Sequence, residues 1–393
     1  MLLFSGTASA DQFDLSEGAQ FIRSGSVAGE LRSYFMNRTF RAGSVQQANA
    51  LGGNLTYETS AYQGLALGLA LYTSQRLPFT PATACGTNLL GPGQESFAVL
   101  GQSYLKYRRG GTKLLLFRQE FNTPFMNRYD VKMVPVLYEA YTVENRSVAG
   151  LVLTGSFVTG IKTWNSTEFV SLPQAAGYTG VNRPAAMFGA VYSPGGSFSA
   201  QLWNYQVFDF LNTSYFQADR AFSPGPDWTF SLSAQAMGQT ETGDAVAGRI
   251  KSAMFGVLGG ARHGGLLFNA GYTQAAHGTN MVNPYASFPG YSSIMEEDCD
   301  LAGERAWVTH VDYDFSRAGA PGLLASYYHT QAFVAGGSFM SPHQFENNFI
   351  VKYSFAGRMQ GLSVTGKAAY VTNSQSTGGV NYTDLRFITS YKF

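Results

Sequence analysis

The chain ends in Leu385-Arg386-Phe387-Ile388-Thr389-Ser390-Tyr391-Lys392-Phe393, and this stretch decides the fold. Its odd positions carry Leu, Phe, Thr, Tyr and Phe, whereas its even positions carry Arg, Ile, Ser and Lys. One face of such a strand suits lipid and the other suits water, and the terminal aromatic ring suits the membrane interface. The pattern is typical of a strand in an outer-membrane β-barrel.

Two preceding segments repeat this alternation. In 345–356, Phe349, Val351, Tyr353 and Phe355 alternate with Asn348, Lys352 and Ser354. In 361–371, Leu362, Val364, Ala368 and Tyr370 alternate with Ser363, Thr365 and Lys367. A half-buried strand of a soluble protein would also alternate, but three successive strands before a C-terminal Phe favour the barrel.

Period-2 segments recur along the whole chain and predict eighteen strands. They are 29–40, 49–60, 64–73, 97–108, 111–119, 134–144, 147–159, 184–193, 196–206, 212–219, 227–236, 248–257, 264–275, 303–315, 321–332, 345–356, 361–371 and 383–393. Longer and shorter gaps alternate between them, except at 207–211 and 220–226. Outer-membrane barrels combine short periplasmic turns with longer extracellular loops. We therefore expect an all-β fold: a transmembrane antiparallel β-barrel of about 18 strands, with a loop folded into the lumen.

Composition agrees with this class. Only 13% of the 393 residues are charged, the mean hydropathy is -0.08, and Gly (45), Phe (30) and Tyr (23) are abundant. Alternating outward apolar and inward polar positions average to such a value. No apolar run reaches the roughly 20 residues of a membrane helix. The net charge of +1, without a basic block, gives no reason to expect nucleic-acid binding.

Residues 1–10 are interpreted as the remnant of a secretory signal peptide, and 11–393 as a single barrel. Leu2-Leu3-Phe4 resembles an apolar region, and Ala8-Ser9-Ala10 fits the small-x-small cleavage pattern. Cys85 and Cys299 are the only cysteines, and a disulfide between them stays open as an alternative to free thiols. We expect no metal, no cofactor and no catalytic role for the scattered histidines.

Three segments resemble the OprD family of substrate-selective outer-membrane porins. Leu31 to Arg41 resembles that family's first strand, and Arg118 to Asp130, running on through Met133-Val134-Pro135, resembles its fifth strand and pore loop. Glu346 through Tyr353, followed by Gly361-Leu362-Ser363, resembles its penultimate strand pair. The resemblance implies an eighteen-stranded channel, monomeric or loosely trimeric, whose third loop enters the lumen. It also implies a ladder of basic residues that guides carboxylate-bearing solutes.

The ladder is thinner here than in the family. Where the family's penultimate strand reads Leu-Ser-Leu-Arg-Leu-Arg, this chain has Leu362-Ser363-Val364-Thr365-Gly366-Lys367. A basic side chain facing lipid at mid-bilayer costs about 2–4 kcal/mol, so basic residues there are expected to face the lumen. The predicted basic wall comprises Arg32, Arg118, Lys352, Lys367 and Arg386, although the alternation leaves the direction of Arg118 open. Lys392 either faces the lumen or snorkels to the periplasmic edge.

The predicted constriction loop is 120–133, with Glu120, Arg128, Asp130 and Lys132. Opposed charges across a narrow lumen orient dipolar solutes, and the alternative is that they only pin the loop to the wall. The expected function is passive diffusion of small hydrophilic solutes, carboxylates or amino acids, across an outer membrane of lipid and lipopolysaccharide. Alternatives are a general diffusion porin, a sheath or scaffold for a partner protein, and a barrel enzyme, which the absence of a catalytic motif disfavours. Neutralising Lys367 and Arg386 is expected to lower anion preference.

Overall fold

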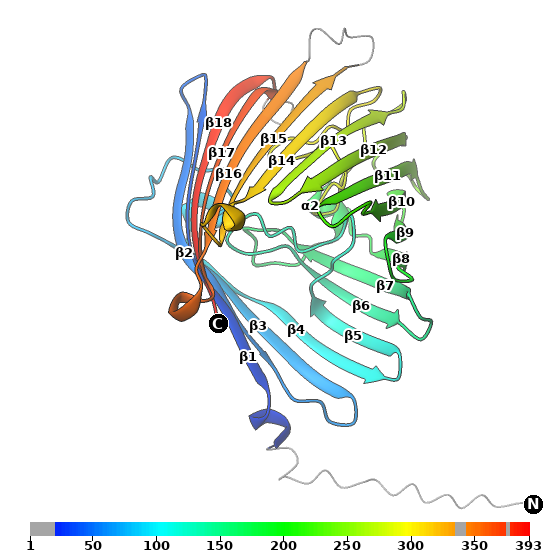
Figure 1. The fold of residues 1–393 in the computed structure, drawn as a ribbon. Helices are drawn as coiled ribbons and strands as arrows, with labels where there is room; N and C mark the ends of the chain where they lie inside the picture. Colours follow the sequence, from blue (N-terminus) through cyan, green and yellow to red (C-terminus); the bar gives the residue numbers. More distant parts are fainter. Residues whose placement is uncertain (1–19, 335–342, 375–377) are drawn as a thin grey trace, which may run out of the picture.

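A computed structural model describes residues 20–334, 343–374 and 378–393. Eighteen strands make up nearly all of its regular structure (Figure 1). They are β1 (Ser26–Phe40), β2 (Val45–Glu58), β3 (Leu65–Arg76), β4 (Phe97–Arg109), β5 (Thr112–Gln119), β6 (Leu137–Asn145), β7 (Leu151–Lys162), β8 (Ala185–Tyr192), β9 (Phe198–Val207), β10 (Leu211–Phe222), β11 (Trp228–Glu241), β12 (Lys251–His263), β13 (Leu266–Ala275), β14 (Arg305–Asp314), β15 (Leu323–Phe333), β16 (Gln344–Ser354), β17 (Leu362–Ser374) and β18 (Val380–Lys392). Short helical turns lie at η1 (Pro92–Gln94), α2 (Leu172–Ala175), η2 (Phe315–Ala318) and η3 (Gly357–Met359).

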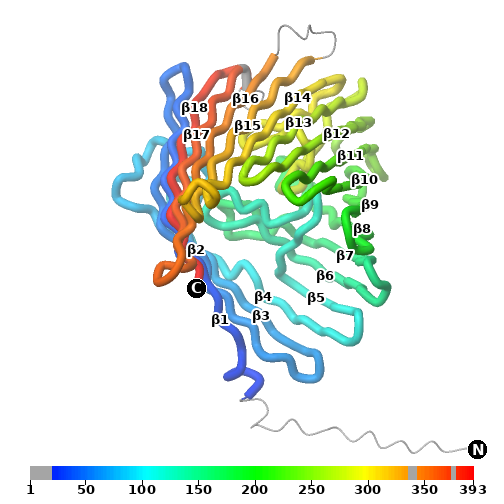
Figure 2. The backbone as a smooth tube through the Cα atoms, in the orientation of Figure 1, coloured from blue at the N-terminus to red at the C-terminus, as the bar shows by residue number. Residues whose placement is uncertain are grey.

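Each strand pairs antiparallel with the next, and β18 pairs with β1, so the sheet closes into a barrel (Figure 2). The last residue completes the seam. The N–H of Phe393 donates to the Gly29 carbonyl at 3.1 Å, and the N–H of Gly29 donates back at 3.0 Å. The Phe393 ring covers Gly29, where an added Cβ would lie 2.6 Å from the ring. The terminal aromatic that marked the fold in the sequence therefore also fills the space over a glycine in the first strand.

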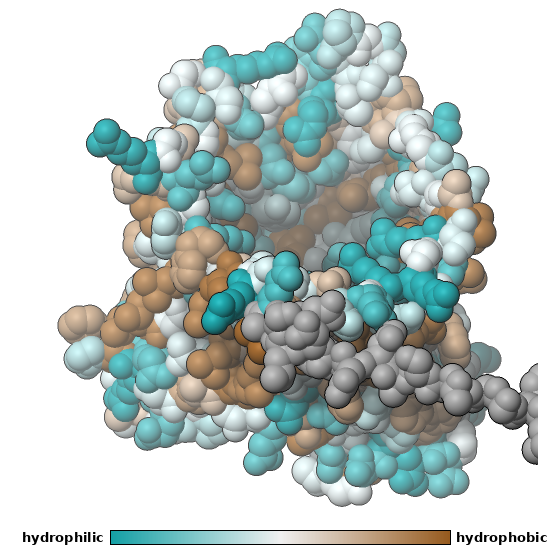
Figure 3. All heavy atoms as spheres, turned by 90° about the horizontal axis from the view of Figure 1, so that it is seen from below, coloured by the Kyte–Doolittle hydropathy of each residue, from teal (hydrophilic) through white to brown (hydrophobic). Residues whose placement is uncertain are grey.

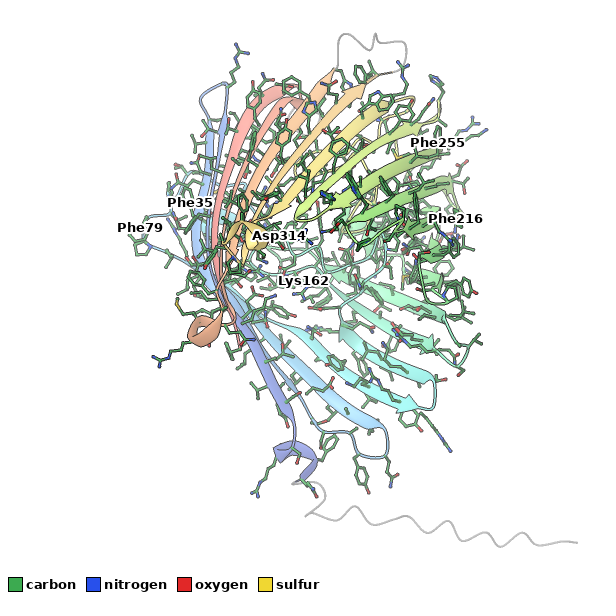
Figure 4. All side chains as sticks on the ribbon, in the orientation of Figure 1. Phe35, Phe79, Lys162, Phe216, Phe255 and Asp314 are labelled. Atoms are coloured by element: carbon green, nitrogen blue, oxygen red, sulfur yellow. The ribbon has the colours of Figure 1, made fainter. Side chains whose placement is uncertain are left out.

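The two faces of the strands differ as the alternation predicted. In β3 the odd positions from Leu65 to Leu71 are exposed, and the even positions from Ala66 to Tyr72 are buried inside. Figure 4 shows Phe216 and Phe255 on the outer surface and Lys162 within the barrel. The outward apolar band, with small and polar side chains turned inward, confirms the membrane-spanning barrel.

The strand ends separate into two kinds of connection. One end has turns such as 110–111 and 264–265, and the other has segments as long as 163–184 and 276–304. Short turns mark the periplasmic end and long loops the outer end of such barrels. No helix in the described part of the chain is long and apolar enough to cross a membrane.

All eighteen predicted strands are confirmed, with shifted ends. The largest differences are extensions: β11 reaches Glu241 and β12 reaches His263. The predicted inner turn 220–226 is shorter, because Arg220 and Phe222 still pair with β11. The expected signal remnant, 1–10, lies outside the described residues.

Candidate functional site: the lumen and its inserted loops

The segment 120–136, which joins β5 to β6, crosses the barrel interior (Figure 2). Its apolar residues hold it there. Phe125 is fully buried and packs on the rings of Tyr205, Tyr215 and Tyr285, with centroids 5.3–6.0 Å apart. Met133 and Val134 are buried against the wall formed by β1 to β4. The loop is therefore fixed near both ends of its path across the interior.

The loop is also joined to β1 by polar contacts. Both carboxylate oxygens of Asp130 accept from the Arg32 guanidinium, at 2.9 and 3.1 Å. Arg32 also donates to the Lys132 carbonyl at 2.7 Å, and the Tyr34 hydroxyl donates to the Val131 carbonyl at 3.0 Å. Two predicted site residues, Arg32 and Asp130, thus form a bidentate ion pair.

Glu120 and Arg128 lie together on the same loop. Arg128 lies 3.7 Å from Glu120 and 3.3 Å from Asp130, and Glu120 also accepts from the Tyr72 hydroxyl at 3.1 Å. The Arg128 side chain is 44% exposed. It is the most accessible charged side chain of the predicted set on this loop, and it faces the lumen between two carboxylates.

Lys132 differs from the expectation of a charge facing the pore. Its side chain is buried, and its ammonium nitrogen lies 3.5 Å from the Met36 sulfur. Loss of water lowers the pKa of Lys132 to about 7. It forms no ion pair within the described residues. The neighbouring Met133 and Val134 draw this part of the chain onto the wall, and Lys132 is buried with them.

The predicted basic wall divides in the structure. Lys352 and Lys367 line a lumenal cavity of about 520 Å³, together with Arg32 and with Lys392, which faces the lumen. Arg386 does not line it: its side chain is only 2% exposed and is engaged by Asp384, at 2.7 Å, and by Glu296.

Arg118 lies apart from the lumenal cavities. It is 3.5 Å from Glu139, donates to the Leu100 carbonyl at 3.2 Å, and stacks over the Phe169 ring at 4.4 Å. The preceding Phe117 has a left-handed φ of 81° and packs on the outward Tyr141 ring. This irregularity in β5 interrupts the alternation directly before Arg118.

A second lumenal cavity, of about 990 Å³, lies against the opposite wall. Its charged lining is mixed in sign: Lys113, Glu120, Arg128, Glu144 and Arg146. Viewed from below, the molecule is hollowed, with hydrophilic and hydrophobic residues around the hollow (Figure 3). The segment 120–136 contributes to both cavities, because Asp130 and Val131 line the first and Glu120 to Pro124 line the second.

Sequence reasoning did not find the role of the loop 276–304. Three successive N–H groups, of Met295, Glu296 and Glu297, donate to the carboxylate of Glu346 at 3.0–3.2 Å. Glu296 in turn binds Arg38 and Arg386. The available signal was the acidic run Glu296-Glu297-Asp298 beside a basic wall, together with Glu346 inside a strand at an inward position.

Cys85 and Cys299, for which the sequence left a disulfide open, are both free thiols in this structure. Cys85 is exposed in the β3–β4 loop. Cys299, in the loop 276–304, is buried with Ala306 of β14 and Ala332 of β15. The two thiols belong to loops with different surroundings, which the spacing of cysteines in a sequence does not reveal.

We expect the folded barrel to react with one equivalent of a bulky maleimide, at Cys85, and the unfolded chain with two. The reason is that burial both shields the Cys299 thiol and raises its pKa, which suppresses the reactive thiolate. Mass spectrometry of labelled protein, with and without denaturant, measures this. Cys85→Ser is the matched control, and native labelling that survives this change would contradict the assignment.

A closed barrel with an apolar exterior, a polar hollow interior and a charged loop across it is a solute channel of the outer membrane. The model of the family described as outer membrane porin, OprD family, matches residues 19–393. The chain therefore belongs to the OprD family, and it is an outer-membrane porin of the Gram-negative type; its family and fold point to a channel.

The fold resembles solved structures from Pseudomonas aeruginosa. OccK9 (OpdG) superposes with a TM-score of 0.84 at 24% identity, over 95% of this chain and 99% of that one. OpdK, solved with vanillate, gives a TM-score of 0.84 at 20% identity over the same shares. OccK8 (OprE) gives 0.82 at 19% identity, again over 95% and 99%. Among curated proteins, no sequence matches this chain.

Proposed function

We propose that this porin passes small anionic solutes, with small carboxylates as the preferred class and amino acids as a second group. The observation that carries the proposal is the surplus of cations in the 520 Å³ cavity. Arg32, Lys352, Lys367 and Lys392 line it, against the carboxylates of Glu30 and Asp130. Both carboxylates are engaged by Arg32, at 2.9 Å each.

The three lysines are the groups open to a solute. None of Lys352, Lys367 and Lys392 forms an ion pair with another described residue, so their charge is not cancelled locally. Ser363 and Thr365 line the same cavity and supply hydroxyl donors. Hydroxyls and ammonium groups in one wall suit a carboxylate, which accepts hydrogen bonds through two oxygens.

Two observations favour this proposal, the first for the class of solute and the second against a sheath or scaffold for a partner protein. The relative OpdK was solved with vanillate, a carboxylate by its name. The inserted loops 120–136 and 276–304, joined where the Ser287 N–H donates to the Phe125 carbonyl at 3.1 Å, leave little interior space for a protein partner. All residues named come from one barrel, so the proposal holds for a monomer or a trimer.

Replacing Lys352 and Lys367 together by glutamine is expected to shift the channel from anion preference toward none. The change removes two uncompensated charges from a confined lumen, where field strength sets selectivity. The reversal potential in a KCl gradient across a planar bilayer measures it, and liposome swelling with acetate, glucose and glycine ranks the solutes.

Arg386, although predicted to be in the same wall, is left unchanged in this variant because Asp384 and Glu296 already neutralise its charge. Lys113→Gln is the control, since Lys113 lies on the opposite wall and pairs with Glu144 at 3.0 Å. Equal swelling rates for glucose and acetate, with an unchanged reversal potential in the double variant, would instead favour a general diffusion porin.

A further inference from the structure

The outer end of the basic wall holds a carboxylate that belongs to the protein itself. In the barrel, Arg386 of β18 lies opposite Lys367 of β17 and Met36 of β1. Arg38 lies two residues beyond Met36 and opposite Asp384. Glu296, from the loop 276–304, places one oxygen on each of the two arginines. The side chains of Arg386 and Glu296 are 2% and 4% exposed.

Asp384 alone does not balance this group. It accepts from Arg38 at 3.1 Å and from Arg386 at 2.7 Å, which is one negative charge against two positive charges. Glu296 supplies the second negative charge. A carboxylate shared between two guanidinium groups is the arrangement that a permeating carboxylate would adopt at this site.

Hydrogen bonds to the backbone of the loop hold Glu296 in place. The Glu346 carboxylate accepts the N–H groups of residues 295, 296 and 297, and the Asn348 amide holds Glu346 at 2.7 Å. On the following residue, the carboxylate of Glu297 accepts from the Tyr382 hydroxyl at 2.8 Å. Both contacts fix the backbone on either side of the Glu296 side chain.

We propose that Glu296 is a specificity-determining residue: a tethered carboxylate that fills the Arg38–Arg386 site and must be exchanged for the carboxylate of a passing solute. The proposal rests on the proposed anion pathway along the Lys352–Lys367 wall. A solute without a carboxylate cannot replace the interactions of Glu296, because removing it would leave two buried cations with one counter-ion. The exchange thus disfavours neutral and cationic solutes.

The test compares Glu296→Gln with Glu297→Gln in planar bilayers, using benzoate as the probe. Glu296→Gln keeps the shape but leaves the arginine site with an excess positive charge. We expect a shift of the reversal potential toward anions. We also expect the benzoate concentration that halves the chloride current to fall about tenfold, at the lower end of what hydrogen bonds to charged groups contribute. Glu297→Gln removes the same charge from the same segment without touching the arginines. Its amide oxygen can still accept from the Tyr382 hydroxyl, so the backbone beside Glu296 stays held, and the variant is expected to behave as the unaltered chain does.

Two further variants make the result independent of folding. Glu296→Asp keeps the charge and is expected to restore weak benzoate block. Glu346→Gln leaves every arginine contact intact but weakens the hold on the 295–297 backbone, so it is expected to change block in the same direction as Glu296→Gln. A difference in gel migration between unheated and heated samples checks that each variant is folded.

Equal benzoate block in Glu296→Gln and Glu297→Gln would overturn the inference, whether both variants change or neither does. Its failure is separable from that of the proposed function. If the unaltered chain prefers anions and loses this preference in the Lys352/Lys367 double variant, the pathway stands, and only the tethered carboxylate is rejected. If the unaltered chain shows no anion preference, the pathway itself fails.

Discussion

Replacing Gly53 by valine is expected to abolish most of the folded barrel. Gly53 lies in β2 with a φ of 133°, and an added Cβ would stand 1.8 Å from the carbonyl oxygen of Glu30 in β1. The backbone conformation alone costs a non-glycine residue about 1–3 kcal/mol. The overlap with a backbone atom adds to this, because relieving it requires β1 to move away from β2.

The effect would reach the inserted loop 120–136. Glu30, whose backbone would be displaced, accepts from Arg32 at 2.9 Å, and Arg32 binds Asp130 of the inserted loop. Gly366→Val is the matched control, because an added Cβ at Gly366 meets nothing within 4 Å. The readouts are the folded fraction on unheated gels and the urea midpoint of refolding into lipid. A Gly53→Val barrel that refolds as well as Gly366→Val would contradict this account.

The sequence was informative about the strands because each strand obeys one local rule. Lipid on one side and water on the other impose a period of two, and a break in this period is visible residue by residue. The eighteen strands, their alternating connections and the inward Lys352 and Lys367 followed from that rule. The extended end of β12 did not, because its small residues, such as Gly259 and Gly260, carry no clear polarity.

The charges of the loops were less predictable because their partners are distant in sequence. Arg386 meets Glu296 across ninety residues, and Arg32 meets Asp130 across ninety-eight. Alternation says that Arg386 points inward, but whether it faces water or a carboxylate depends on how the loop 276–304 packs. Lys132 shows the same limit: its burial follows from Met133 and Val134 docking on the wall, and no local pattern marks it.

The alternation of outward and inward side chains makes a second large effect predictable, at two adjacent residues in the middle of β16. Phe349 is 58% exposed on the outer face, whereas Ile350 lines the 520 Å³ cavity. Phe349→Arg places a guanidinium in lipid and is expected to destabilise the barrel by about 2–4 kcal/mol, the cost measured for basic residues near mid-bilayer. Ile350→Arg places the same group in the lumen, where water and Glu30 lie in the same cavity.

The two arginine variants therefore separate stability from selectivity. Urea unfolding in lipid vesicles is expected to show a lowered midpoint for Phe349→Arg and a nearly unchanged one for Ile350→Arg. In bilayers we expect the selectivity to change in Ile350→Arg and not in Phe349→Arg. Ile350→Arg raises anion preference, because it adds a cation beside Lys352 and Lys367. Any Phe349→Arg barrel that folds is expected to conduct as the unaltered chain does. Equal loss of stability in both variants would show that Ile350 does not face an open lumen. The anion pathway along Lys352 and Lys367 would then need a different course through the barrel.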